Sequence, residues 1–171
     1  MTSLADLDAV APTIAGFLAA RIRATRLCFL GTVRSDGWPR VSAVEVFLHD
    51  DQIYVGSMPG AVKALDLQRD PRCCLITPLA DSDDLGGEAK IFGRAREVGD
   101  VAEHEAVRGT FKELSGHDMG DLGASHLFAF DIEGAAWQRV EGGDTFRTTS
   151  WNPERGVREF ARGVTGDRVE L

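Results

Sequence analysis

The residues best suited to chemistry form one stretch, Ser57-Met58-Pro59-Gly60-Ala61-Val62-Lys63. A strand-like segment ends at Ser57, Pro59-Gly60 turns the backbone, and a short helix is expected to carry Lys63 in its first turn. The unpaired N–H groups and positive dipole end of a helix favour an anion, to which Ser57 would add a hydroxyl and Lys63 a full charge. Two interpretations stay open from this pattern alone: a phosphate site, or a solvated lysine after a simple connector.

Other side chains with chemical potential are scattered, and we predict no metal site. The four histidines do not combine with the three cysteines into short-spaced zinc ligand pairs. An acidic cluster lacks the regular spacing and glycine turn of a calcium loop, so we interpret it as a solvated loop. The residues concerned are His49, His104, His117, His126, Cys28, Cys73, Cys74, Asp81, Asp83, Asp84 and Glu88.

No residue is predicted to be catalytic. His49 lies in an expected turn, while His126 and Glu45 lie in expected strands, and each such residue is more often structural than an acid or base. No strand–GxGxxG–helix unit is present, so a Rossmann nicotinamide site is not expected. The three tryptophans, Trp38, Trp137 and Trp151, could stack on a planar ligand, but core or dimer packing is the preferred interpretation.

Composition restricts the class of protein. The 171 residues suit one globular domain, with 19 basic against 27 acidic residues and a formal charge of -8. That charge would repel a phosphate backbone, so nucleic acid is not an expected partner. Because the chain has neither a long apolar run nor the features of a secretory signal, we expect no membrane association and a cytoplasmic location, with reduced cysteines.

The elements expected around the Ser57–Lys63 stretch are short strands with a few helices. An apolar stripe predicts an N-terminal helix over residues 3–23, with a break or late start near Pro12. A short helix over 61–69 would turn Val62, Leu65 and possibly Leu67 toward the core. Strands are predicted at 27–33, 40–48, 52–56, 72–77, 88–98, 127–132, 136–140 and 145–150, with an Asp100-capped helix to about residue 114. The barrel core would span 26–150, and the polar tail 152–171 would fray.

This pattern favours a mainly β protein, an antiparallel barrel with peripheral helices, over alternating βαβ units. Three of its segments also resemble the pyridoxamine 5'-phosphate oxidase-like split β-barrel superfamily. They are Arg40-Val-Ser-Ala-Val44, Ile53-Tyr-Val-Gly-Ser57 and Lys63-Ala-Leu-Asp-Leu-Gln-Arg-Asp-Pro-Arg72. The similarity runs from about Arg26 to Val98.

The resemblance implies a homodimer that holds flavin mononucleotide (FMN), the deazaflavin F420 or, in some members, haem in a groove between subunits. Lys63 matches the phosphate-binding lysine of the family, Arg40 its strand arginine, and Ser57 the hydroxyl that closes the third strand. Ser42, one alternation along from Arg40, and Met58, next to Ser57, complete the implied cofactor-binding set.

Departures from the family pattern limit what the resemblance implies. Oxidases of the family carry Ser-Arg directly before the lysine, where this chain has Ala61-Val62, and a basic residue where it has Glu45. The arginine-rich substrate motif at the chain end of true pyridoxamine-phosphate oxidases is missing as well. That activity is therefore not expected, and between the two cofactors the pattern leans to F420 over FMN.

The resemblance implies hydride transfer between the reduced cofactor and a small organic acceptor, with no need for an acid–base dyad because the cofactor carries the chemistry. Two alternatives remain at this stage. One is a non-catalytic protein that carries or senses flavin, deazaflavin or haem. The other is a dimer that kept the barrel and lost its ligand.

Overall fold

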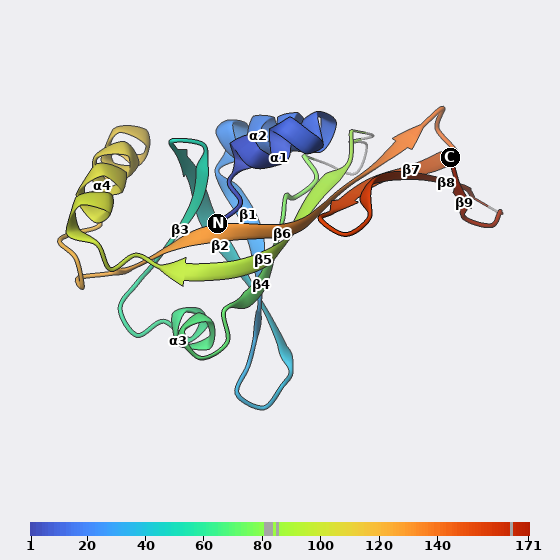
Figure 1. Cartoon of the computed structure of the whole chain (residues 1–171). Coiled ribbons are helices and arrows are strands. Elements are labelled where there is room, and N and C mark those ends of the chain that lie inside the picture. The colour runs from blue at the N-terminus through green and yellow to red at the C-terminus, as the bar shows by residue number, and fades with distance from the viewer. Residues whose placement is uncertain (81–83, 85, 165) are drawn as a thin grey trace.

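Six strands form a closed antiparallel barrel in the computed structural model, which describes all residues except 81–83, 85 and 165 (Figure 1). The sheet order is β3-β2-β1-β4-β5-β6, and a further pairing of β3 with β6 closes the barrel. Strands β7, β8 and β9 continue the sheet beyond β6. The strands are β1 Leu27–Val33, β2 Pro39–His49, β3 Gln52–Ser57, β4 Arg72–Ile76, β5 Glu88–Glu97, β6 His126–Glu141, β7 Thr145–Asn152, β8 Gly156–Gly163 and β9 Val169–Glu170.

Tight turns set the register of the first strands. Gly37, with φ at 83°, lies in the turn between β1 and β2, which pair from Leu27 opposite Glu45 to Val33 opposite Pro39. Asp50 and Asp51 join β2 to β3 with φ of 45° and 57°, a left-handed conformation at both central residues that matches the twist of a hairpin. The mainly β antiparallel barrel predicted from the sequence is confirmed.

Two helices replace the one N-terminal helix that was predicted, with the expected break. Helix α1 (Leu4–Val10) begins with a capping box between Ser3 and Asp6, and α2 (Pro12–Thr25) begins with Pro12 in its first turn. Figure 1 shows α1 and α2 on one side of the barrel and α3 (Val62–Arg69) on the opposite side. The apolar stripe of these helices packs against the barrel core as expected, except that Val10 is exposed. Its buried members are Leu4, Leu7, Ile14, Leu18 and Ile22.

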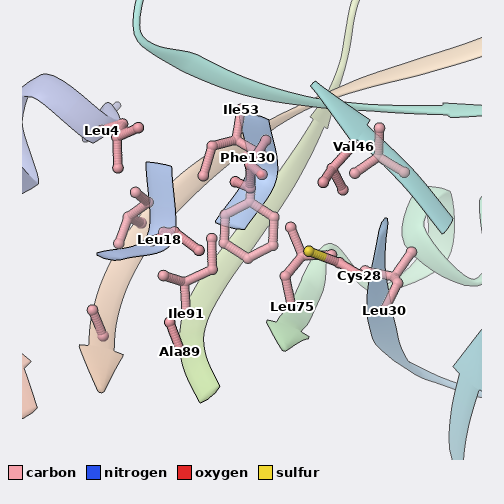
Figure 2. Packing of buried hydrophobic residues seen from close by; sticks show 14 of the residues in the cluster. Leu4, Leu18, Cys28, Leu30, Val46, Ile53, Leu75, Ala89, Ile91 and Phe130 are labelled. Carbon is pink, nitrogen blue, oxygen red and sulfur yellow. The ribbon is translucent and has the colours of Figure 1, made fainter. Parts of the chain in front are cut away.

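The barrel interior is an apolar core shared with these helices. Figure 2 shows Phe130 at its centre, with Leu4 and Leu18 reaching in from α1 and α2 and with Ile91 and Leu75 from β5 and β4. Each of these five side chains is buried. Burial of a side chain of this size contributes about 1.5–3 kcal/mol, so this core is the main term that stabilises the barrel.

A second apolar cluster lies outside the barrel, under α4 (Val101–Ser115). Asp100 caps this helix, as predicted, by accepting a hydrogen bond from the Glu103 amide at 2.8 Å. Phe47, Tyr54 and Val107 are buried between the helix and the sheet. Burial first, and then the neighbouring Glu103 carboxylate, raise the pKa of Tyr54 to about 12.

Two sequence predictions for the C-terminal third are corrected. The expected strands 127–132 and 136–140 are one strand, β6, in which Glu133 is an extra residue: Phe92 pairs with Gly134 and Gly93 with Ile132. One extra residue in one strand of an antiparallel pair forms a β-bulge, which bends the strand without ending it.

The tail 152–171 is also not frayed, because it folds back as β8 on β7 and as β9 on β8. Asn152 starts the return by accepting hydrogen bonds from the amides of Glu154 and Arg155 at 3.1 and 2.9 Å. The tail carries few apolar side chains, and the pairing with β7 that orders it is not visible in the sequence.

The β-bulge provides a test of the fold. A Cβ at Gly93 would lie 1.8 Å from the Asp131 carbonyl oxygen, whereas one at Gly16 on α2 would meet nothing within 4 Å. Gly93→Ala should therefore lower the free energy of unfolding by about 1–3 kcal/mol or more. Gly16→Ala should raise it by about 0.5–1 kcal/mol through helix propensity. Urea denaturation of both variants checks this, and a stable Gly93→Ala protein would contradict the β5–β6 register.

Candidate functional site

Helix α3 closes one end of the barrel and carries the residues of the candidate site. It buries Ala64, Asp66 and Leu67, while Val62 and Leu65 are exposed. The prediction that Val62 and Leu65 face the core was wrong. The helix is rotated about its axis so that Ala64 and Asp66 face the barrel instead. The reason is Asp66: a carboxylate on a short helix is ordinarily solvated, but this side chain is only 4% exposed and lies against the barrel.

Asp66 is the centre of a polar group that joins α3 to β1 and β2, here called the Asp66 cluster: Thr32, Arg40, Asp66 and Arg69. Arg40 Nε and Thr32 Oγ1 donate to Asp66 Oδ2 at 2.6 and 3.0 Å. Arg69 donates to Asp66 Oδ1 at 3.4 Å and also to the Val33 carbonyl. Burial alone would raise the pKa of Asp66, but these hydrogen bonds and the Arg40 charge outweigh it and hold that pKa below its ordinary value.

A second polar group lies on the other side of α3, here called the His126 bridge: Gly60, Gln68, Glu97 and His126. The Gly60 amide donates to His126 Nε2 at 3.3 Å, and His126 Nδ1 lies 2.6 Å from Glu97 Oε1. Gln68 Nε2 donates to Glu97 Oε2 at 2.8 Å. The bridge thus connects the turn before α3, α3 itself, and the ends of β5 and β6.

The start of α3 lies between these two groups and has no cap. Ala61 occupies the N-cap position and offers no side chain to the first amides of the helix. Lys63 is half-buried in the first turn, and within the described part of the chain no ion pair joins it to a carboxylate. Lys63 and Asp66 are neighbours on α3, three residues apart. Because Arg40 is bound to Asp66, Arg40 lies beside the helix that carries Lys63. A cation and uncapped amides at this position suit an anion.

Ser57 and Ser42 lie on the strands that lead to this end of the barrel. Ser57 pairs with His126 across β3 and β6, and its hydroxyl oxygen is buried with no hydrogen-bond partner among the described residues. A buried hydroxyl without a partner is costly, so it points to a ligand or water there. Ser42 is half-buried, two residues from Arg40 on the same face of β2.

Met58 is 74% exposed and faces a surface pocket of about 600 Å³ next to Ser57. The pocket lies between Glu45 of β2, the end of β3, the C-terminal part of α4 and the loop before β6. Its lining is largely apolar, with polar groups at a few positions: Glu45, Gly56, Ser57, Met58, Pro59, Phe111, His117, Asp118, Met119, Ala124 and Ser125.

The structure thus places Arg40 and Lys63 at α3, and Ser57 and Met58 at the adjoining end of β3. Sequence reasoning missed Asp66, Glu97 and the binding partners of His126. The only signal for Asp66 was a carboxylate three residues after Lys63 on a short helix, and such a residue is usually solvated. Glu97 gave no signal, because the pairing of β5 with β6 that brings it to His126 is not visible in the sequence.

Other candidate groups do not form a site. Within the described residues, no group of three or more His, Cys, Asp or Glu side chains could hold a metal ion. Asp84 is not a solvated loop residue, because it pairs with Arg21 and accepts from the Ala80 amide. Asp81 and Asp83, from the same predicted acidic cluster, lie outside the described residues.

The tryptophans divide between packing and exposure. Trp137 stacks on Phe17 with ring centroids 5.0 Å apart, and Trp151 packs against the barrel core. Trp38 is 70% exposed at the β1–β2 hairpin.

Among the described helices, none has the length and apolar character that crossing a membrane requires.

Comparison with known proteins identifies the family. The sequence model described as "Pyridoxamine 5'-phosphate oxidase" matches residues 14–138, and no curated protein matches the chain in sequence. Campylobacter jejuni ChuZ superposes with a TM-score of 0.70 at 10% identity, over 91% of this chain and 65% of that one.

Two further solved structures share the fold. A Clostridium acetobutylicum protein related to general stress protein 26, of the pyridoxinephosphate oxidase family, gives a TM-score of 0.57 at 13% identity, over 82% of this chain and 96% of that one. A heme binding protein from Mycobacterium smegmatis gives 0.54 at 15% identity, over 88% of each chain.

The Asp66 cluster yields a prediction about stability. Asp66→Ala leaves Arg40 and Thr32 without their acceptor, and should lower the free energy of unfolding at pH 7 by about 1.5–3 kcal/mol. The folded-state pKa of Asp66 is depressed, so its stabilisation is complete above the unfolded-state pKa of about 3.9 and is lost as pH falls through the folded value. The difference from wild type in urea denaturation should therefore shrink at pH 3. Glu133→Ala removes an exposed partner of Arg94 and serves as control, with a loss below about 1 kcal/mol. Equal losses in both variants would contradict the cluster.

Proposed function

The chain belongs to the pyridoxamine 5'-phosphate oxidase family, and from that premise we propose that it binds F420 or FMN through the cofactor phosphate and transfers hydride to a small organic acceptor. The observation that carries the proposal is the uncapped start of α3, with half-buried Lys63 in its first turn and Arg40 alongside.

The residues at α3 fit a phosphate. The first amides of α3 lack a side-chain acceptor, and Lys63 supplies a positive charge next to them. Arg40 bonds Asp66 through Nε. Within the described residues its two terminal guanidinium nitrogens make no hydrogen bond, so they could donate to an anion. The Ser57 hydroxyl has no partner within the described chain and could donate as well. Ala61 and Val62 stand where oxidases of the family carry Ser-Arg and offer no side-chain donor to a phosphate, so the backbone amides, Lys63 and Arg40 would carry the binding.

The pocket beside Met58 fits the planar part of such a cofactor or its acceptor. Its apolar lining at Met58, Phe111 and Met119 would exclude water, and a few polar groups would fix orientation. When bound, the cofactor supplies a hydride with both electrons of the reduction, and the acceptor takes its proton from solvent. The task of this chain is then to bind, orient and shield, which agrees with the expectation that no residue acts as a dedicated acid or base.

A homodimer is part of the proposal. On the outer face of the barrel, Val41, Gly31, Cys74 and Phe92 follow one another by register across β2, β1, β4 and β5. Val41 is 70% and Phe92 49% exposed, and an apolar sheet face of this kind suits a protein interface.

Light scattering should give the mass of two chains, and a monomer at micromolar concentration would contradict a stable dimer.

A second candidate is binding of haem or a flavin without turnover. The pocket is lined by His117, Met58 and Met119, and both side-chain types serve as axial ligands of haem iron. A Soret band in the purified protein, or after addition of haem, would favour this candidate. Reduced F420 or FMN mixed with acceptors separates the enzyme from a carrier, since only an enzyme would accelerate reoxidation beyond the rate of the free cofactor.

Lys63→Ala tests the phosphate site. Loss of one charge-assisted contact to the phosphate should weaken cofactor binding by about 1.5–3 kcal/mol, roughly ten- to a hundredfold in Kd. The measurement is a fluorescence titration with FMN and with F420. Arg155→Ala, which removes a cation from the exposed β7–β8 turn, is the matched control and should leave Kd unchanged. Equal affinities of wild type and Lys63→Ala would remove Lys63 from the site.

A further inference from the structure

We propose that the His126 bridge is a pH-responsive latch on the anion site: neutral His126 holds the Gly60 amide, and protonated His126 releases it and adds positive charge. The inference rests on the proposed function, because it assigns a regulator to the same phosphate site. His126 is a positioning residue in this account, since it acts through the turn that leads into α3.

The contacts define the state of the imidazole. The Gly60 amide donates to His126 Nε2 at 3.3 Å, so Nε2 carries no proton. Nδ1 must then hold the proton and donate it to Glu97 Oε1, 2.6 Å away. These contacts fit a neutral ring with its proton on Nδ1, held by hydrogen bonds on both sides.

Glu97 is held in place as the acceptor. Its other oxygen accepts from Gln68 of α3 at 2.8 Å. Burial would raise the pKa of Glu97, but the hydrogen bonds from His126 and Gln68 outweigh it and hold that pKa below its ordinary value. Glu97 thus stays a carboxylate throughout the range in which histidine side chains titrate.

Protonation of His126 changes the turn in two ways. Nε2 becomes a donor, so it can no longer accept from the Gly60 amide, and two N–H groups would face each other. Gly60 has a φ of 69° and is exposed, so the turn can move its amide away from the ring at little cost. The freed amide lies three residues before Lys63, at the start of the helix that lacks a cap.

Charge acts in the same direction. The described groups that contact the ring are Glu97 from β5, Gly60 from the turn and Phe128 from its own strand, and Ser57 is the residue opposite His126 on β3. Of these only Glu97 is ionisable, and Lys63 is the first cation of α3 after the turn. The positive charge of protonated His126 cancels the negative charge of Glu97. The surroundings of Lys63 therefore become more positive. By linkage, an anion bound at α3 also favours the protonated ring.

The test compares wild type with His126→Gln, whose side-chain oxygen can accept from Gly60 and whose amide can donate to Glu97 without titrating. Kd for FMN is measured for both at pH 8 and pH 5.5. The ratio of the two proteins at each pH cancels the titration of the FMN phosphate itself, which has a pKa near 6. We expect equal Kd at pH 8 and about fivefold or more tighter binding by wild type at pH 5.5. His49→Gln, which changes a histidine at the opposite β2–β3 turn, should behave as wild type.

A second readout needs no cofactor. In 15N-labelled protein, the Gly60 amide resonance of wild type should shift with pH together with the His126 ring nitrogens, and should stay constant in His126→Gln. A Kd ratio of one at both pH values, with FMN bound, would overturn the latch and leave the proposed function intact. If neither FMN nor F420 binds, the proposed function fails, and an invariant Gly60 resonance then overturns the latch as a structural device.

Discussion

The ion pair between Arg40 and Asp66 is the contact on which the site depends. It places a buried carboxylate of α3 against a strand arginine, with Thr32 donating to the same carboxylate oxygen and Arg69 to the other. Such a pair adds little net stability compared with apolar packing, but removal of one partner is costly, so the pair strongly favours one position of the helix. Because Asp66 must face β1 and β2, Val62 and Leu65 turn outward and Lys63 is fixed at the barrel end.

Two polar groups, the Asp66 cluster and the His126 bridge, hold α3 from opposite sides. The Asp66 cluster fixes the middle of the helix, and the His126 bridge fixes the turn before it through Gly60 and its second half through Gln68. The start of the helix between them is left uncapped at Ala61. A helix fixed by other contacts can leave its first amides to a ligand, and this preorganisation reduces the entropy lost on binding.

Much of the fold could be predicted from local chemistry. Pro12 broke the N-terminal helix as expected, Asp100 capped α4, and the short apolar segments from Leu27 to Val98 became strands of the barrel. The bulge at Glu133 and the return of the tail as β8 were not predicted. Both depend on pairing between strands, which the sequence pattern does not show. Lys63 was proposed from the local pattern and from the family resemblance, and Arg40 from the resemblance alone. Asp66 came from neither route, because the burial of a carboxylate depends on partners that only the fold supplies.

The central claim, that α3 presents an anion site for a cofactor phosphate, is tested most directly by comparing FMN with riboflavin, which has the same ring system and no phosphate. Fluorescence titration at one pH and salt concentration gives both Kd values. The account predicts that FMN binds at least about tenfold tighter, the effect of one charge-assisted phosphate contact. Equal binding of FMN and riboflavin would show that the phosphate makes no contact at α3, and would contradict the account.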